Sequence, residues 1–224
     1  MISIAIDGPA GAGKSTVAQK VASRLGYIYV NTGSFYRAVS FYLICHGIKI
    51  DNEDLIENTL PKINFELKFL NGKQIILLEN EDISQKIRSE QVSTVASKIS
   101  ALKSVRLHLL DMQRKIADEN NVVMDGRDIG TVVLPHATVK IFLTASANER
   151  ANRRFREIKK GDKDITFEQV LNSITQRDYR DSKRDIAPLK PAESAIILDS
   201  THLTFSNVVL KILEIVRAHC QNNN

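Results

Sequence analysis

Residues 8–15 of this 224-residue chain read Gly-Pro-Ala-Gly-Ala-Gly-Lys-Ser, a complete G-x-x-x-x-G-K-[ST] phosphate-binding loop, or P-loop. The loop lies between a short apolar run at residues 2–6 and a segment with helical apolar spacing at residues 16–25. Glycine tolerates the backbone angles that turn N–H groups toward a phosphate, and the next helix directs its positive end at the same anion. The pattern therefore predicts a strand, loop and helix that bind a nucleoside triphosphate; the alternative is a glycine-rich turn with an unrelated lysine.

The loop assigns a role to each of its residues. We expect the backbone N–H groups of Gly11, Ala12 and Gly13 to bind phosphate oxygens. Lys14 is expected to reach the β- and γ-phosphates, and Ser15 to ligate Mg²⁺. The predicted nucleotide-binding residues are Gly8, Pro9, Ala10, Gly11, Ala12, Gly13, Lys14, Ser15 and Thr16.

Length and composition favour one enzyme domain, or one domain with a sizeable insertion. No apolar stretch reaches 18 residues and no leader pattern precedes the loop, so we expect a soluble, cytoplasmic protein. Cys45 and Cys220 lie far apart without metal spacing, which favours buried or incidental thiols over a disulfide or zinc site. The five histidines are scattered and receive no role.

The net charge of +5 is local. Residues 150–190 hold 12 Lys and Arg against 7 Asp and Glu, whereas the rest of the chain holds 19 of each sign. The segment is rich in arginine and poor in interleaved aromatic residues. It fits the clamping of small phosphates at least as well as a nucleic-acid surface.

Short apolar runs alternate with helical patterns along the chain, which predicts an α/β fold with a parallel sheet wrapped by helices. The expected strands are residues 2–6, 27–30, 122–124, 139–143 and 195–198. Gly26 is the expected C-terminal cap of the helix after the P-loop. Residues 31–37 lead into a second helix that runs to about His46.

One segment breaks this alternation. Residues 63–69 alternate polar and apolar, Asn71-Gly72 is a turn signal, and residues 74–78 form another apolar run. We predict a β-hairpin within an inserted subdomain at about residues 61–90. The alternative is an antiparallel edge added to the main sheet.

Two capping boxes predict a pair of helices in the basic region. Ser146 with Glu149 opens a helix to about Lys160 that stops at Gly161, and Thr166 with Gln169 opens a helix to about Arg184. Each helix carries one arginine-rich face. The face of the first helix consists of Arg150, Arg153 and Arg154, and that of the second consists of Arg177, Arg180, Asp181 and Arg184. Planar guanidinium groups match the spread charge of a transferring phosphoryl group. The alternative is a pair of solvated faces whose arginines pair with Glu149, Glu157 and Asp178.

The run Asp125-Gly126-Arg127-Asp128 follows a predicted strand, at the edge where open α/β sheets bind ligands. We expect Asp125 to assist Mg²⁺, Arg127 to hold a phosphate and Asp128 to accept from an exocyclic amine. Arg37 emerges at the same edge and is a second phosphate-clamp candidate. The alternative for the acidic run is a type I turn with exposed charges.

This combination closely resembles the bacterial cytidylate kinases, P-loop nucleoside monophosphate kinases that phosphorylate CMP and dCMP. The resemblance covers the chain from end to end and rests on residues 6–16, 32–37, 96–97, 105–106, 125–133, 177–181 and 198–201. Asn31, where the family often has Asp, and Phe35, which replaces a smaller apolar residue, depart from it. The resemblance implies one P-loop kinase domain over residues 1–224, with the hairpin insertion at about 61–90 as its monophosphate-binding subdomain and residues 150–164 as a helical lid.

The resemblance also implies roles for the site residues. Ser97, Arg106 and Asp128 would read cytosine, and Arg177 and Asp181 would hold the sugar. Arg37, Arg127 and Arg184 would grip the acceptor phosphate. The residues expected to act in catalysis are Lys14, Arg127, Arg150, Arg153 and Arg154, and those expected at the metal are Ser15 and Asp125.

The implied reaction is transfer of the γ-phosphoryl group of Mg-ATP to CMP or dCMP. ATP and Mg²⁺ are the expected cofactors, and we expect a monomer without nucleic-acid or membrane partners. The nearest rival is another small-molecule kinase of the same fold. A nucleotide switch or nucleic-acid-binding protein is the rival from a different class, although no Asn-Lys-x-Asp guanine motif occurs.

Overall fold

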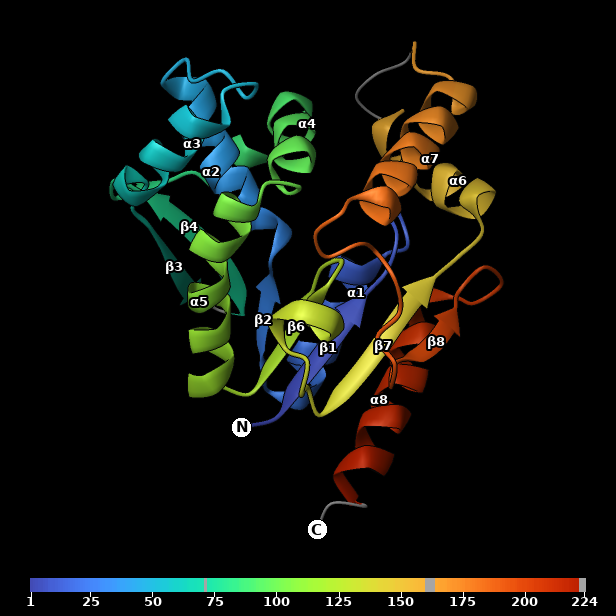
Figure 1. The fold of residues 1–224 in the computed structure, drawn as a ribbon. Coiled ribbons are helices and arrows are strands. Elements are labelled where there is room, and N and C mark those ends of the chain that lie inside the picture. The colour runs from blue at the N-terminus through green and yellow to red at the C-terminus, as the bar shows by residue number, and fades with distance from the viewer. Residues whose placement is uncertain (71, 160–163, 222–224) are drawn as a thin grey trace.

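A parallel five-stranded sheet forms the centre of the computed structural model, which describes residues 1–70, 72–159 and 164–221 (Figure 1). The strand order is β2-β6-β1-β7-β8, so the first strand along the chain lies in the middle of the sheet. The strands are β1 (Ser3–Asp7), β2 (Ile28–Asn31), β6 (Val122–Asp125), β7 (Val139–Thr144) and β8 (Ile196–Asp199). The predicted α/β fold with a parallel sheet is confirmed.

Helices cover both faces of this sheet because side chains of successive strand residues point to opposite faces. Ile4 and Ile6 pack with apolar residues of α1 and α8 on one face, whereas Ala5 joins a core with α2 and α5 on the other. A third, smaller core joins α6 to α7. The helices are α1 (Lys14–Leu25), α2 (Gly33–Cys45), α3 (Glu53–Thr59), α4 (Glu90–Ile99), α5 (Lys103–Glu119), α6 (Ala147–Ile158), α7 (Phe167–Lys183) and α8 (Phe205–Gln221), with 3₁₀ turns at Leu60–Lys62 and Lys86–Arg88.

The predicted hairpin is confirmed and lies in a separate antiparallel sheet. Its strands β3 (Phe65–Leu70) and β4 (Lys73–Leu78) pair along their full length, and the short β5 (Glu81–Asp82) adds to β4. The alternative of an antiparallel edge on the main sheet is therefore wrong. Gly72 has φ 72°, as a tight turn requires, while Asn71 lies outside the described residues. The bounds of the inserted subdomain and of the lid stay predictions.

Several elements differ from expectation in their bounds. All five predicted strands end one residue later than expected because parallel pairing continues past the last apolar residue. Their last residues are Asp7, Asn31, Asp125, Thr144 and Asp199. The π-helix at Ile129–Val133 was not predicted. Both capped helices form as expected, and Thr166 and Gln169 make the full capping box. The predicted helix end at Lys160 and Gly161 lies outside the described residues, and α6 is assigned to Ile158.

The parallel arrangement brings the carboxyl ends of all main strands to one edge. The P-loop follows β1, α2 follows β2, and residues 126–128 follow β6 at this edge. In Figure 1, α3 and the hairpin lie to one side of the edge and the α6–α7 pair to the other. In the described residues, no helix combines the length and apolar character needed to cross a bilayer.

Gly8 allows the P-loop to begin directly against β7. Its φ is 147°, and a Cβ atom there would lie 2.0 Å from the backbone oxygen of Leu143. We expect Gly8→Ala to lower the free energy of unfolding by at least about 3 kcal/mol, because strand backbone must shift. Gly47→Ala is the matched control: φ is 63° but nothing lies within 4 Å, so only backbone strain of about 1 kcal/mol applies. Urea titrations measure both values, and equal losses would contradict the close approach.

Candidate active site

The P-loop has the backbone form that phosphate binding requires. Gly8, Gly11 and Gly13 have φ of 147°, 74° and 84°, and α1 begins immediately afterwards at Lys14. The Lys14 side chain is buried, and its Nζ donates to the carbonyl oxygen of Pro9 at 2.7 Å. Burial, with the nearby Arg127 charge, lowers the pKa of Lys14 well below its usual value. A phosphate beside this lysine would relieve that penalty.

Ser15 and Asp125, both expected at the metal, lie in direct contact. Ser15 Oγ donates to Asp125 Oδ2 at 2.8 Å, and the hydroxyl of Tyr29 donates to Asp125 Oδ1 at 2.8 Å. The Asn31 side-chain amide donates to Ser15 Oγ at 3.2 Å and to the Tyr29 hydroxyl at 3.0 Å. Burial raises the pKa of Asp125, and a nearby cation would favour its charged form. A hydroxyl and a carboxylate beside a phosphate loop fit Mg²⁺, which takes a few protein oxygens together with phosphate oxygens and water.

Two side chains beside Ser15 and Asp125, the expected Mg²⁺ residues, had no expected role. Tyr29 and Asn31 were not assigned to the metal site, since nothing in a short strand indicates which neighbours its polar atoms reach. In the part of the chain that the structure describes, no three His, Cys, Asp or Glu side chains group as a metal cluster. Cys45 and Cys220 are free thiols, and Cys45 is exposed.

Asp7 links the P-loop to the segment after β6. Its buried carboxylate accepts the backbone N–H groups of Ile129 and Gly130 at 2.8 and 2.7 Å. Burial raises the pKa of Asp7 to about 6, although both hydrogen bonds oppose the shift. This anchor fixes Asp128, which directly precedes Ile129. The sequence signal for it was an acidic residue at the end of an apolar strand.

Asp128 joins two predicted substrate-binding arginines. Arg106 donates through NH2 to Asp128 Oδ2, and Arg184 NH2 lies 3.4 Å from Oδ1. Arg106 also donates to the carbonyl of Ser100 at 3.0 Å, and its guanidinium carbon lies 5.8 Å from the centroid of the Tyr36 ring. Burial raises the pKa of Asp128, which the arginines oppose. Arg184, expected at the acceptor phosphate with Arg37 and Arg127, lies at this carboxylate, and its role at the phosphate stays a prediction.

Next to Asp128 and its two arginines lies a group of side chains with more positive than negative charge. Arg127 Nε donates to Asp181 Oδ2 at 2.9 Å, and Arg177 Nε lies 4.0 Å from the same oxygen. Burial, reinforced by Arg127, lowers the pKa of Arg177 to about 10 and also lowers that of Arg37. The Arg37 side chain forms no hydrogen bond or ion pair within the described residues. This cluster, Arg37, Arg127 and Arg177 around Asp181, has the charge that an incoming phosphate would neutralise.

The three arginines predicted to act from the lid differ in their placement. Arg150 is buried and donates to the carbonyls of Ala145 at 2.8 Å and Ala10 at 2.9 Å. Arg153 donates to the carbonyl of Ser200 at 2.7 Å and reaches that of Ala12 at 3.5 Å. The Arg154 side chain is 54% exposed and pairs with Glu157 at 3.1 Å. Two of the three therefore lie against the P-loop backbone or its neighbours, and their catalytic role stays a prediction.

Two further side chains bear on the site. Ser97 Oγ, predicted to read the base, is buried and has no hydrogen-bond partner among the described residues. Gln74 of β4 accepts from the backbone N–H of Asn31 at 2.7 Å and donates to Ser34 Oγ at 2.6 Å. The inserted hairpin thereby braces the start of α2. Sequence reasoning missed Gln74, because only tertiary packing brings β4 to this position.

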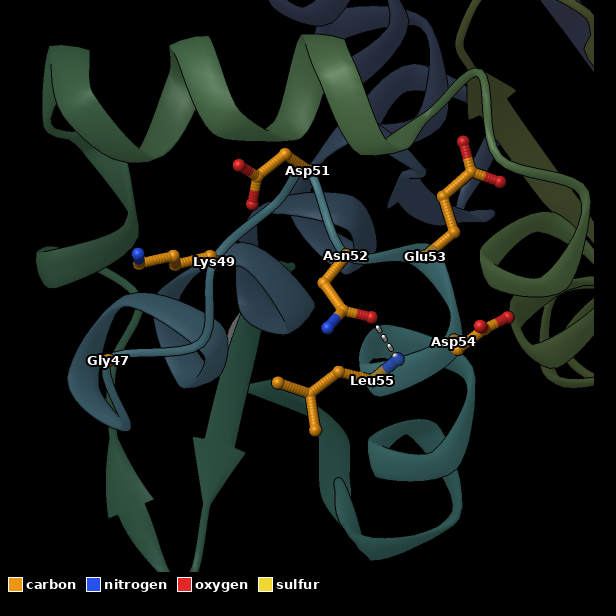
Figure 2. Close-up of a pocket in the computed structure, with 7 residues that line it drawn as sticks. All are labelled: Gly47, Lys49, Asp51, Asn52, Glu53, Asp54 and Leu55. Carbon is orange, nitrogen blue, oxygen red and sulfur yellow. Dashed lines mark hydrogen bonds between the residues drawn. The ribbon is translucent and has the colours of Figure 1, made fainter.

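A hollow at the start of α3 carries the opposite charge (Figure 2). The carboxylates of Asp51, Glu53 and Asp54 line it beside Lys49, and Asn52 caps α3 by accepting the N–H of Leu55 at 2.9 Å. This acidic lining disfavours phosphates. We therefore assign the nucleotides to the sheet edge and not to this hollow.

Comparison with known sequences finds relatives over almost the whole chain. The family model described as cytidylate kinase matches residues 4–218. The cytidylate kinase of Caldicellulosiruptor saccharolyticus is 47% identical over 214 residues, covering 96% of this chain and 95% of that protein. The cytidylate kinase of Thermotoga maritima is 45% identical over 215 residues, covering 96% of each chain.

Solved structures share the fold at much lower identity. An uncharacterised protein from Eubacterium ventriosum has a TM-score of 0.55 at 12% identity, covering 97% of this chain and 98% of its own. A gluconokinase from Sinorhizobium meliloti has a TM-score of 0.51 at 13% identity, covering 99% and 94%. At this identity the likeness concerns the fold alone.

The raised pKa of Asp7 predicts a pH dependence of stability. Because the folded protein binds this proton more tightly than the unfolded chain, the stabilisation is complete below the usual value of 3.8 and is lost as pH rises through about 6. Relative to Asp7→Asn, the wild type should gain on the order of 2 kcal/mol of unfolding free energy from pH 7 to pH 4. Urea titrations at each pH measure this difference, with Asp111→Asn, an exposed carboxylate of α5, as control. A difference that stays constant or shrinks toward pH 4 would contradict the assignment.

Proposed function

This chain belongs to the cytidylate kinase family, and we propose that it transfers the γ-phosphoryl group of Mg-ATP to CMP or dCMP, giving ADP and CDP or dCDP. The observation that carries the proposal is the meeting of two phosphate sites at one sheet edge. The P-loop with Ser15 and Asp125 suits the donor, and the Arg37, Arg127 and Arg177 cluster suits the acceptor phosphate.

The reaction needs no protein base. The attacking oxygen belongs to the acceptor's α-phosphate and is already anionic. It forms a bond to the γ-phosphorus of ATP while the bond from that phosphorus to the β,γ-bridging oxygen breaks, and ADP leaves with the bridging oxygen. Catalysis then rests on in-line positioning and on positive charge around the transferring group. Lys14 and Arg127 supply this charge, and Arg153 and Arg154 are candidates on α6.

Ser15 and Asp125 are proposed to hold the Mg²⁺ that accompanies ATP. Ser15 would offer its hydroxyl oxygen, and Asp125 would hold that hydroxyl or a water on the ion. The ion would neutralise charge on the β- and γ-phosphates. Tyr29 and Asn31 keep both oxygens in place through their hydrogen bonds.

Asp128 and Arg106 are proposed to read the base. Cytosine carries an exocyclic amine where uracil carries a carbonyl, so a buried carboxylate oxygen accepts from the amine but faces a second acceptor oxygen in uracil. Arg106 occupies Oδ2, whereas Arg184 approaches Oδ1 only at 3.4 Å. Since each carboxylate oxygen has two acceptor sites, Oδ1 remains able to accept the amine. Ser97, whose Oγ has no partner among the described residues, supports a polar contact to the same base.

Asp181 and Arg177 are proposed to hold the sugar. The proposal further includes a monomer in the cytoplasm without nucleic-acid or membrane partners. The absence of a nucleic-acid partner is supported by three arginines of the basic segment 150–190, which bind Ala10, Ser200 and Asp181 within the protein. Less of the positive charge of this segment is therefore available on the protein surface.

Initial rates of ADP formation from Mg-ATP test the reaction. With CMP, dCMP, UMP, AMP or GMP at equal concentration, we expect strong turnover only with the two cytidine nucleotides. Lys14→Ala should lower turnover by about 10²–10³-fold and leave the thermal melt of the fold in place, because it removes one charge aimed at the phosphates. Turnover with another acceptor would overturn the base assignments, and ADP formation independent of any acceptor would overturn the kinase assignment.

Replacing Asp128 tests how the base is read. We expect Asp128→Asn to lower the ratio of kcat/KM for CMP to that for UMP by at least about 100-fold, because the carboxylate acceptor is lost. The Asn side chain keeps the shape, and a thermal melt reports whether the buried arginines still pack. Asp185→Ala, which removes an exposed carboxylate near Arg184, is the control and should leave the ratio unchanged. A ratio unchanged in Asp128→Asn would remove Asp128 from base recognition.

A further inference from the structure

One ion pair between α6 and α7 contacts the P-loop backbone. Arg150 of α6 and Asp178 of α7 form a salt bridge, and their side chains are only 8% and 20% exposed. The backbone N–H of Ala10 donates to Asp178 Oδ1 at 3.0 Å, and the Ala10 carbonyl accepts from Arg150 NH1 at 2.9 Å. Both polar backbone groups of one P-loop residue are thus fixed by the two members of one salt bridge.

The surrounding packing leaves Arg150 little freedom. Its Nε donates to the carbonyl of Ala145 at 2.8 Å, so the guanidinium is held from two directions. A Cβ atom at Gly11 would lie 3.2 Å from the Cβ of Arg150, which shows how closely the loop backbone approaches α6. Arg150 therefore meets the loop at the carbonyl of Ala10 and not at the N–H groups of Gly11, Ala12 and Gly13 expected to bind phosphate.

The P-loop needs such external support. Gly8, Gly11 and Gly13 all have positive φ, and glycine has the largest backbone freedom to lose on ordering. A loop that samples other conformations binds its ligand more weakly in proportion to the fraction that is competent. Fixing the Ala10 peptide groups from outside raises that fraction without touching the phosphates.

We propose that Asp178 is a positioning residue for the donor nucleotide and that Arg150 acts with it, holding the P-loop in its phosphate-binding form. The inference rests on the proposed binding of ATP at this loop. It assigns Arg150 to loop positioning, whereas the arginine pattern alone predicted a charge that closes on the transferring group. Asp178, which the sequence offered only as a partner for surface arginines, becomes part of the donor site.

The proposal predicts a selective loss of donor affinity. In Asp178→Ala the KM for ATP and the Kd for ADP should rise about tenfold, while kcat at saturating ATP falls by less than the rise in KM. The KM for CMP should not rise, because losing the Asp178 charge near Arg177 leaves the acceptor cluster more positive. Asp178→Asn, which keeps an acceptor for the Ala10 N–H, should fall between wild type and Asp178→Ala.

A double-mutant cycle tests whether the pair acts as one unit. Arg150→Gln and Asp178→Ala should each weaken ADP binding, and the double variant should bind ADP about as well as either single variant. Glu168→Gln removes an exposed carboxylate from α7 without reaching the loop and is the matched control. Thermal melts accompany every variant, and if Asp178→Ala does not fold, Asp178→Asn decides the question.

Calorimetric titration with ADP separates this inference from the proposed function. ADP binding needs no acceptor, so a wild-type protein that binds ADP but does not phosphorylate CMP would fail the proposed function and still test the positioning role. Unchanged ADP affinity in the folded variants, an equal loss of ATP and CMP affinity, or a fall in kcat of Arg150→Gln with unchanged ATP affinity would each overturn the inference.

Discussion

The pairing of β1 with β6 is the constraint on which the site depends. Its parallel register sets Ile6 opposite Asp125, so the P-loop and the acidic run leave the sheet side by side. The Asp7 carboxylate then extends this contact beyond the strands by binding the N–H groups of Ile129 and Gly130. One register thus fixes Asp125 beside the P-loop, where we propose the Mg²⁺ site, and one buried carboxylate fixes Asp128, the proposed base-reading residue, relative to that loop. A slip of the register or loss of the carboxylate would separate the two proposed nucleotide sites.

The site buries more positive charge than the carboxylates within it neutralise. Burial lowers the pKa of Lys14, Arg37 and Arg177 and raises that of Asp125 and Asp128. Burial therefore disfavours the charged form of the basic and of the acidic side chains. Charges held this way interact strongly with a ligand because little water screens them. Phosphates of the two nucleotides would supply the missing negative charge. This is the arrangement that electrostatic stabilisation of a transferring phosphoryl group requires.

Local chemistry explains which features the sequence could predict. The P-loop, the hairpin and the two capped helices follow from residues that are neighbours along the chain, and they form as expected. Tyr29, Gln74 and Asp7 act through partners 43 to 123 positions away, which no local pattern indicates. The motif residues Ser15 and Asp125 could be paired in advance only because parallel strands end at a common edge. Prediction therefore succeeded for elements and for the edge, and it failed for the side chains that brace them.

The arginines of α6 show that residue spacing predicts a shared helix face but not the partners of each side chain. Spacing placed Arg150, Arg153 and Arg154 on one face, but that face is divided between the P-loop and solvent. Arg150 donates to two backbone carbonyls and to Asp178, so these donors already hold structure. The Arg37 side chain has no hydrogen bond or ion pair in the described part of the chain, which leaves its donors available to a ligand. We therefore expect unused donors, as on Arg37, to mark the substrate clamp, and donors bound to the loop backbone, as on Arg150, to mark the frame that keeps the phosphate loop in place.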